Sequence, residues 1–234
     1  MKAMILAAGR GERMRPLTDT CPKPLLDVAG TPLIGWHLKR LAAAGITEVV
    51  INHAWLGAMI ENALGDGSAY GVRIAYSAEN TALETAGGIA QALPLLGDAP
   101  FAVINGDIFT DYDFAALVAV AERMRASDAV RAHLVLTPKA GYPTGRDLAI
   151  GNGLAMVCAE EDAPMTFCGI AVYRPDFFAD VVPGQASPLL PHFLTAMAEQ
   201  QVSAECFGGL WLDVGTMDRL EYAGEIARNH TSGV

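Results

Sequence analysis

The stretch LAAGRGERMRPLTDTCPKPLL, from Leu6 to Leu26, decides the fold that we expect for this chain. It completes an apolar run, KAMILAAG, that begins at Lys2. The apolar residues are consecutive rather than alternating, which is typical of a strand that is covered on both faces in a parallel sheet. Because the run ends in two glycines separated by one residue, Gly9 and Gly11, we expect a tight turn at the carboxyl end of a central strand.

Strands and helices alternate after this stretch. Strands are predicted at residues 48–52, 72–77 and 101–107, and helices at residues 31–45, 56–64 and 86–96. In the first helix, Thr31 is the expected N-cap, Pro32 is the first helical residue and Gly45 ends the helix. The alternation predicts the α/β fold class, with a mostly parallel sheet flanked by helices and with ligands gathered at the carboxyl ends of the strands.

The pattern changes after Asp111. Helices are predicted at residues 114–126, 187–200 and 217–229, and strands at residues 132–137, 154–158, 167–175, 202–207 and 209–215. Residues 138–153 are polar and contain several glycines and prolines, so we interpret them as a loop that faces a substrate. We expect a single domain over residues 1–228, followed by a frayed tail at residues 229–234.

Composition limits the class of protein. With 234 residues, of which 52% are hydrophobic, the chain is long enough for one large domain. No charge-free apolar run is long enough to span a membrane, and the amino terminus enters a strand without a cleavage site, so we expect a cytoplasmic protein with no membrane partner. The net charge of −10 argues against nucleic-acid binding. Arg10, Arg13, Arg15 and Lys23 nevertheless cluster in the opening stretch, which suits a small anion such as a nucleotide.

The segment GRGERMRP, residues 9–16, fits neither of two familiar phosphate-binding loops. It lacks the Gly-Lys-Ser/Thr ending of a Walker loop, and Met14 occupies the place of the third glycine of a dinucleotide fingerprint. The shared chemistry remains, since Gly9 and Gly11 allow backbone N–H groups to approach phosphate oxygens. The arginines add forked donors, and Lys23 adds a mobile point charge. Together these features favour an anion site over a solvated basic turn.

The same stretch resembles the signature of the sugar-1-phosphate nucleotidyltransferases, which runs Leu-Ala-Ala-Gly-x-Gly-x-Arg-x-x-Pro-Leu-Thr and then Pro-Lys-Pro. Four later segments follow in that family's order: ETAGGI at 84–89, NGD at 105–107, FCGI at 167–170 and WLDVGT at 211–216. The resemblance covers nearly the whole chain. It implies a Rossmann-like nucleotidyltransferase fold with a mostly parallel mixed central sheet, a nucleotide-binding half at residues 1–110 and a sugar-binding half at residues 111–228.

The reaction implied by this resemblance joins a nucleoside triphosphate (NTP) to a sugar 1-phosphate and releases pyrophosphate. UTP and N-acetylmuramate 1-phosphate are favoured, because INHAWLG, LETAGGI and NGDIFTDYDF look most similar to the uridylyltransferases of peptidoglycan recycling. A mannose-1-phosphate guanylyltransferase, or another hexose-1-phosphate nucleotidyltransferase, is the alternative within the family. A non-catalytic nucleotide-sugar sensor is the alternative outside it, although a sensor typically loses the lysine or a metal-binding acid. The expected assembly is a monomer or a small homo-oligomer.

The resemblance also assigns site residues. Arg13 would grip the β- and γ-phosphates, Lys23 would neutralise the α-phosphate, and Asp107 and Asp213 would hold one Mg²⁺. Further nucleotide contacts are implied at Ala8, Gly9, Gly11, Gly87 and Gly88, and sugar contacts at Asn105 and Gly169. Asp147 and Thr166 are the polar residues nearest in sequence to the sugar pocket, so we predict sugar contacts there and at Arg146. The attacking phosphate has a second pKa of about 6, so it is already an anion at neutral pH and requires no general base.

One segment departs from the family pattern. Many relatives carry Glu-Lys-Pro shortly before the FCGI strand, with a lysine that holds the sugar phosphate, whereas this chain reads AEEDAP at residues 159–164. Either Arg146 replaces that lysine or the metal contributes more.

Overall fold

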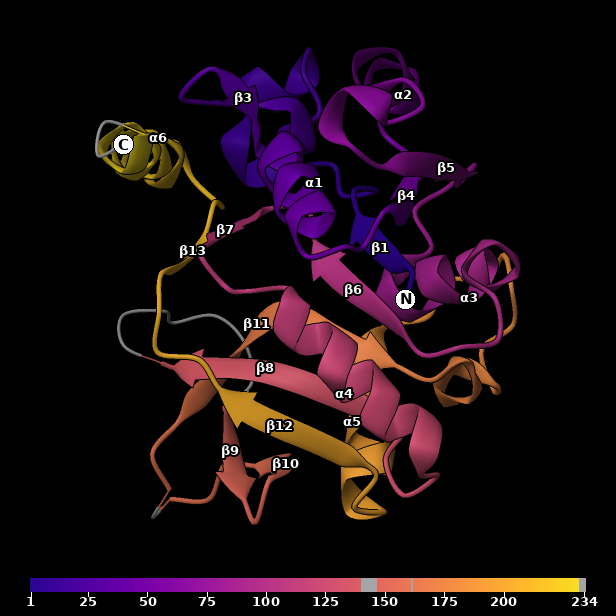
Figure 1. Ribbon diagram of the computed structural model, residues 1–234. Helices are drawn as coiled ribbons and strands as arrows, with labels where there is room; N and C mark the ends of the chain where they lie inside the picture. Colours follow the sequence, from indigo (N-terminus) through magenta and orange to yellow (C-terminus); the bar gives the residue numbers. More distant parts are fainter. Residues whose placement is uncertain (140–146, 161, 232–234) are drawn as a thin grey trace.

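The computed structural model describes residues 1–139, 147–160 and 162–231. Nine strands of these residues form one sheet in the order β5-β4-β1-β6-β11-β8-β12-β10-β9, shown in Figure 1. Their bounds are β1 Ala3–Leu6, β4 Glu48–His53, β5 Arg73–Ala78, β6 Phe101–Asn105, β8 Ala132–Pro138, β9 Leu148–Gly151, β10 Leu154–Val157, β11 Met165–Tyr173 and β12 Val202–Cys206.

Strand direction gives the sheet one edge that is rich in carboxyl ends. Strands β5, β4, β1 and β6 are parallel neighbours. Strand β11 is antiparallel to both β6 and β8, and β12 is parallel to β8. Strands β8 and β12 therefore point the same way as β6, so the carboxyl ends of these six strands share one edge. The predicted α/β fold with a mostly parallel, mixed sheet is confirmed.

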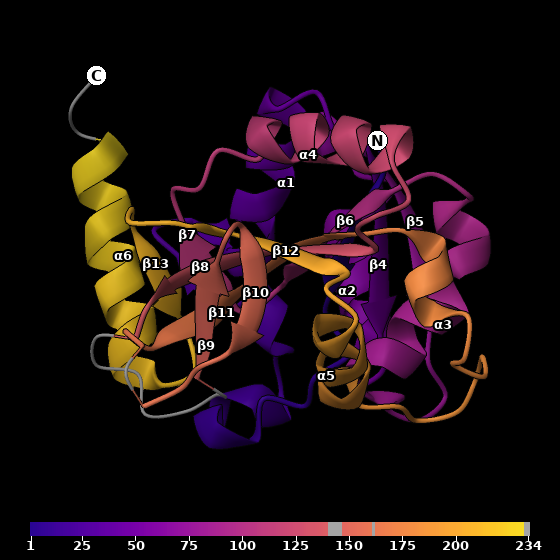
Figure 2. The same cartoon turned by 90° about the horizontal axis from the view of Figure 1, so that it is seen from below.

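Helices cover both faces of the sheet. Helices α1 (Leu33–Ala43), α2 (Gly57–Leu64) and α4 (Ala115–Ala126) pack in one core with alternate strand residues such as Ile5. Helices α3 (Glu84–Leu96) and α5 (Leu189–Ala198) pack in a second core with the intervening residues such as Met4. Figure 2 shows α4 and α5 on opposite sides of the sheet. The continuous apolar run of β1 follows from this double covering, because every side chain of the strand meets a helix layer.

A small ribbon and the last helix complete the chain. Strand β7 (Ile108–Thr110) follows β6 after a two-residue turn and pairs antiparallel with β13 (Trp211–Asp213). Helix α6 (Met217–Thr231) packs on this ribbon and on the short hairpin of β2 (Asp27–Val28) and β3 (Thr31–Pro32) through a third apolar cluster. None of the helices in the described ranges combines the length and apolar character needed to cross a membrane.

Several predicted boundaries were wrong. Thr31 is not the N-cap of α1: it pairs in the β2–β3 hairpin, its hydroxyl accepts a hydrogen bond from Lys39 Nζ at 3.1 Å, and the N-cap position falls to Pro32. Strand β9 lies inside the predicted loop at 138–153, because its first residues are buried against the second core. Helix α6 continues to Thr231, two residues beyond the predicted end of the helix at residue 229.

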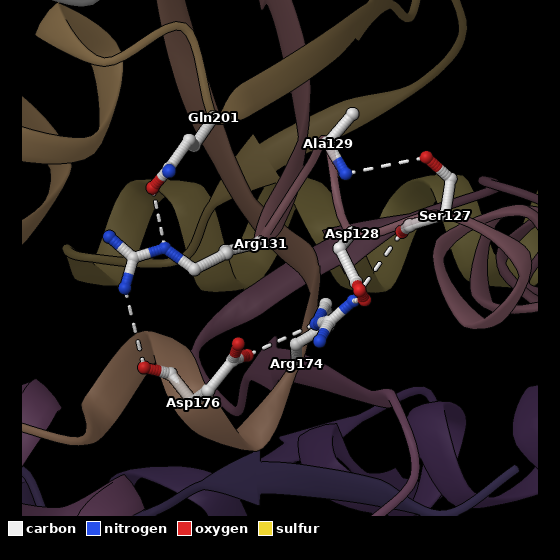
Figure 3. Close-up of polar contacts among 7 residues, drawn as sticks. All are labelled: Ser127, Asp128, Ala129, Arg131, Arg174, Asp176 and Gln201. Atoms are coloured by element: carbon white, nitrogen blue, oxygen red, sulfur yellow. Dashed lines mark hydrogen bonds and ion pairs between the residues drawn. The ribbon is translucent and has the colours of Figure 1, made fainter.

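Two arginines stabilise the edge of the sheet opposite the carboxyl ends (Figure 3). Arg131, just before β8, donates from Nε to Gln201 Oε1 at 2.6 Å. Arg174, just after β11, donates to Asp176 Oδ1 at 3.1 Å and pairs with Asp128. Because these cations are engaged by scaffold residues, they are not candidates for binding a ligand at the carboxyl edge.

Candidate active site

Two adjoining cavities open at the carboxyl edge of the sheet. The first, of about 570 Å³, lies beside residues 7–23 and is called the loop cavity. The second, of about 440 Å³, is walled by α5 and is called the α5 cavity. Both are lined by Leu6, Thr85, Asn105 and Asp107. The carboxyl end of β6 therefore stands at the boundary between two spaces, each large enough for part of a small-molecule ligand.

The opening loop, residues 7–23, is folded around Gly11. This residue has φ +65°, and a Cβ atom there would lie 2.8 Å from Thr18 Cγ2. The Thr18 hydroxyl donates to Gly11 O at 2.8 Å, which closes the loop on itself. Gly11 is thus required by both conformation and space. A Cβ at Gly9 would meet nothing within 4 Å in the described structure, so Gly9 leaves the backbone open toward the cavity.

The four cations of the opening loop do not act as one cluster. Arg13 and Lys23 line the loop cavity. Arg10 instead lies with its Cζ 4.5 Å from the centroid of the Trp55 ring. Arg15 donates from Nε to Asp19 Oδ1 at 2.7 Å on the surface. Arg13 and Lys23 therefore line one cavity, whereas Arg10 and Arg15 contact other residues of the loop and its surroundings.

Glycine at position 215 makes room for Arg13. A Cβ atom at Gly215 would lie 3.0 Å from Arg13 Nη2, in the segment that follows β13. The exposed Arg13 side chain therefore lies against Gly215, where a larger residue would come too close to the guanidinium group. Gly215 belongs to the WLDVGT segment, so the signal was present in the sequence although its role was not predicted.

Lys23 reaches the boundary between the cavities. Its Nζ lies 2.8 Å from Asp107 Oδ2, and its side chain is only 8% exposed, against 39% for Asp107. Pro22 and Pro24 flank the lysine and restrict the backbone on both sides. The Lys23 ammonium is mostly buried and is held in place beside Asp107. The Asp107 carboxylate is partly exposed, so it can still bind a ligand or a metal.

The ribbon of β7 and β13 brings Asp107 and Asp213 to adjacent positions. Asp213 is paired with Ile108, and Val214 N donates to Asp107 O at 2.9 Å. Both acids line the α5 cavity. Asp213 Oδ2 also accepts from Arg219 Nη1 at 3.1 Å. The two acids thus lie at neighbouring positions through a ribbon that the sequence did not predict, and their joint binding of a metal stays a prediction.

Asp107 and Asp213 suit a hard metal ion that also keeps water or substrate oxygens as ligands. No group of three or more His, Cys, Asp or Glu side chains able to hold a metal occurs within the described ranges. Mg²⁺ is commonly bound through one or two carboxylates together with water and substrate phosphate oxygens. Two neighbouring carboxylates at an open cavity fit that mode, and they do not form a closed protein cage.

The predicted sugar contacts are only partly brought together. Asn105, Thr166 and Gly169 line the α5 cavity. Gly169 has φ +72°, and a Cβ there would lie 2.5 Å from Asn105 Nδ2. Asp147 is absent from the described lining, and its carboxylate pairs with Lys139. Arg146 lies outside the described residues.

Gly87 and Gly88 are explained by packing in the first turns of α3. A Cβ at Gly87 would lie 2.3 Å from Gln185 O, and one at Gly88 would lie 2.6 Å from Glu79 Oε1. Both glycines are buried, and the described linings of the two cavities include Thr85 but neither glycine. Their contact with a nucleoside stays a prediction. Ala8 and Gly9 line the loop cavity, and their contact with a nucleotide likewise stays a prediction.

A family model described as Nucleotidyl transferase matches residues 2–141. The chain is 53% identical to the N-acetylmuramate alpha-1-phosphate uridylyltransferase of Neisseria meningitidis serogroup B, over 97% of this chain and 98% of that protein. This chain belongs to the sugar-1-phosphate nucleotidyltransferases. A protein of the same name from Caulobacter vibrioides is 39% identical to it over 91% of each chain.

A solved structure agrees with the fold of this nucleotidyltransferase. A putative glucose-1-phosphate thymidylyltransferase from Bacillus anthracis superimposes with a TM-score of 0.80, over 98% of this chain and 96% of that one. The two chains are 23% identical, so this likeness concerns the fold alone.

Sequence reasoning missed two buried residues in the loop cavity of this nucleotidyltransferase. Asn52 Oδ1 accepts from Ala7 N at 3.0 Å, and Asn52 Nδ2 donates to Glu79 Oε1 at 2.7 Å. Glu79 Oε2 accepts from Leu83 N at 2.9 Å. The pair thus ties the start of the opening loop to the segment before α3. The available signal was Asn52 itself, a polar residue at the carboxyl end of a buried strand.

The sequence also did not predict that α5 forms one wall of a cavity. Leu189, Leu190, Phe193, Leu194 and Met197 line the α5 cavity. The described lining of this cavity contains no lysine or arginine. Residues 187–200 were predicted to be a helix, but nothing in their pattern distinguishes a side that faces a cavity from one that faces the core.

Proposed function

We propose that this nucleotidyltransferase transfers a uridylyl group from UTP to N-acetylmuramate α-1-phosphate, giving a UDP-sugar and pyrophosphate. The choice of substrates is supported by the names of the two relatives and by their high coverage of the chain. A mannose-1-phosphate guanylyltransferase is the competing activity. The cytoplasmic location and the monomeric or small homo-oligomeric state stay predictions.

The observation that carries the proposal is that two cavities meet at Asp107, one that carries Arg13 and Lys23 and one that is lined mainly by apolar side chains. In the loop cavity, Arg13 and Lys23 supply charge for a triphosphate. In the α5 cavity, aromatic and aliphatic side chains suit the less polar faces of a sugar ring. A triphosphate in the first cavity and a sugar 1-phosphate in the second would bring their reacting phosphates together at the shared boundary.

The proposed chemistry depends on position and charge. The sugar phosphate is the nucleophile and is anionic at neutral pH, because its second pKa is about 6. We assign to Lys23 the stabilisation of charge that develops on the α-phosphate, because its buried ammonium lies at the boundary. Arg13 holds the outer phosphates, which become the pyrophosphate product. Bringing the two substrates together in a fixed geometry supplies much of the rate enhancement.

Asp107 and Asp213 would hold Mg²⁺ in the proposed enzyme. The metal, when bound, would neutralise phosphate charge and polarise the α-phosphate. The Lys23 ammonium balances the charge of Asp107, and the Arg219 guanidinium balances that of Asp213, which keeps two acids stable side by side.

Pyrophosphate release tests the proposed substrates. UTP, GTP, CTP and dTTP would each be combined with the 1-phosphates of N-acetylmuramate, N-acetylglucosamine and mannose, with and without Mg²⁺. We expect the highest kcat/KM for UTP with N-acetylmuramate 1-phosphate. A higher value for GTP with mannose 1-phosphate would replace the proposed substrates, and tight binding without any turnover would favour a sensor.

We further propose that Arg146 recognises the lactyl carboxylate that distinguishes N-acetylmuramate from N-acetylglucosamine. Loss of a charge-assisted hydrogen bond to a carboxylate costs about 1.5–3 kcal/mol. Arg146→Ala should therefore lower kcat/KM for N-acetylmuramate 1-phosphate by about 10-fold or more and leave the value for N-acetylglucosamine 1-phosphate nearly unchanged. An equal loss on both amino sugars would instead place Arg146 at the sugar phosphate.

A further inference from the structure

We infer that Trp55 is a positioning residue that clamps the opening loop in the conformation that binds the triphosphate. Trp55 lies in the turn between β4 and α2, outside the opening loop. It contacts that loop at two separate points, Arg10 and Thr18. Neither Trp55 nor Arg10 is among the described residues that line the loop cavity. The tryptophan therefore acts on the triphosphate through the loop, and the inference rests on the proposed nucleotide site.

The first contact fixes the limb that leaves β1. The Arg10 guanidinium carbon lies 4.5 Å from the centroid of the Trp55 ring, within the range of a cation–π interaction. This contact turns Arg10 away from the loop cavity, and the next residue is Gly11, whose φ of +65° sets the turn. Holding Arg10 in place therefore limits the backbone motion of its neighbours, Gly9 and Gly11.

The second contact fixes the returning limb. Trp55 Nε1 donates to Thr18 O at 2.9 Å. Thr18 is buried, and its hydroxyl in turn donates to Gly11 O at 2.8 Å. The chain from Trp55 through Thr18 to Gly11 joins both limbs of the loop. Arg13 lies between these limbs, so the clamp sets the base from which its exposed side chain extends.

A neighbouring residue of the same segment fixes the start of the loop. Asn52, which is three residues before Trp55, accepts a hydrogen bond from Ala7 N at 3.0 Å. Residues 52–55 thus contact the opening loop at its beginning and in its middle. A loop ordered before the ligand arrives loses less conformational entropy on binding, so the clamp contributes to triphosphate affinity without touching the ligand.

Trp36 provides a matched control in the same chain. Its Nε1 donates to a backbone carbonyl, Val28 O, at 3.0 Å, and Lys39 Nζ lies 5.6 Å from its ring centroid. The two tryptophans therefore share two kinds of contact, and Trp36 also packs edge to face on Phe109 of β7, with ring centroids 5.7 Å apart. Trp36 packs in the cluster beneath α6 and contacts no part of the opening loop among the contacts described. A general cost of losing such a tryptophan would appear at both positions, whereas a clamp would appear at Trp55 alone.

Steady-state kinetics with the best substrate pair, together with thermal unfolding, tests the inference. Trp55→Phe keeps a ring for Arg10 and loses the N–H donor, and we expect the KM for the triphosphate to rise about 2- to 10-fold. Trp55→Leu loses both contacts, and we expect a rise of about 5- to 50-fold. In both variants the KM for the sugar 1-phosphate should stay unchanged. Trp36→Leu should leave both KM values unchanged.

Three results would overturn the clamp. One is an equal rise in both KM values, and another is a lower unfolding temperature with an unchanged KM for the triphosphate. The third is the same triphosphate effect from Trp36→Leu. Calorimetric titration of UTP in the absence of sugar separates this inference from the proposed reaction. If no sugar in the panel is turned over, weaker UTP binding by the Trp55 variants still supports the clamp, and unchanged binding refutes it.

Discussion

The loop cavity and the α5 cavity are built in opposite ways. One contiguous segment, residues 7–23, supplies the glycine turn and both cations of the loop cavity, and residues from other segments, such as Glu79 and Asp107, complete its described lining. The α5 cavity is formed by β6, β11, β13 and α5, and its described lining carries acids and apolar side chains without a lysine or arginine. The comparison indicates that the positive charge available to both substrates lies on the nucleotide side. The phosphate of the sugar 1-phosphate therefore depends on groups at the boundary.

The largest effect is expected at two acids, Asp107 at the boundary and Asp213 in the α5 cavity. Asp107→Asn and Asp213→Asn should each lower kcat/KM by about 100-fold or more with Mg²⁺ present, because each removes a carboxylate beside the reacting phosphates. Asp111→Asn is the matched control: its Oδ1 accepts from Leu210 N at 2.8 Å, and the amide oxygen of asparagine can replace it. A variant of either acid that keeps more than about a tenth of the wild-type kcat/KM would not have lost an essential ligand.

Lys23 should give the next largest effect and tests whether charge on the loop side serves the transition state. Lys23→Ala is expected to lower kcat about 100-fold with a smaller change in the KM for the triphosphate. The substitution also leaves Asp107 without its cation at 2.8 Å, so the fold should be checked by thermal unfolding. Lys39→Ala, which removes an exposed lysine, is the control. A change confined to KM would assign Lys23 to ground-state binding.

The contrast between the cavities also explains what the sequence could predict. Gly11, Arg13 and Lys23 lie within one short stretch, so local spacing was enough to predict an anion site. Asp107 and Asp213 are far apart in the chain, and only the strand-end positions and the family resemblance brought them together. The side of α5 that faces the cavity depends on how distant elements pack, and periodicity in residues 187–200 carries no information on that. Trp55 was missed for the same reason.

Gly169 tests the geometry of the α5 cavity with a smaller expected effect. Gly169→Ala introduces a Cβ at φ +72° and 2.5 Å from Asn105 Nδ2. We expect a loss of about 1–3 kcal/mol in the free energy of unfolding and a KM for the sugar phosphate that rises about 10-fold. Gly153→Ala shares the conformational cost at φ +78° but has nothing within 4 Å of the new Cβ in the described structure. Urea unfolding of the two variants separates strain from contact with Asn105. Equal losses of stability and an unchanged KM would show that the close approach of Gly169 to Asn105 does not control sugar binding.

His37 should have the smallest effect on turnover at neutral pH. It lies close to Ile108 and Asp107 of the α5 cavity, so it tests how far the scaffold behind that cavity can change. It lies on α1 in the core, and burial lowers the pKa of its imidazole to about 4. Because the unfolded chain has a histidine pKa near 6.5, it binds more protons than the folded chain between these values. The contribution of neutral His37 to the free energy of unfolding is therefore fully present above about pH 6.5. It falls as the pH drops toward 4, by about 1.4 kcal/mol for each pH unit once the pH is well below 6.5. Replacing His37 with leucine should remove this slope, which urea unfolding between pH 7 and pH 4.5 would measure, whereas His192→Leu should retain it. A His37→Leu variant that lost activity at pH 7.5 while remaining folded would show that α1 is coupled to the boundary between the cavities.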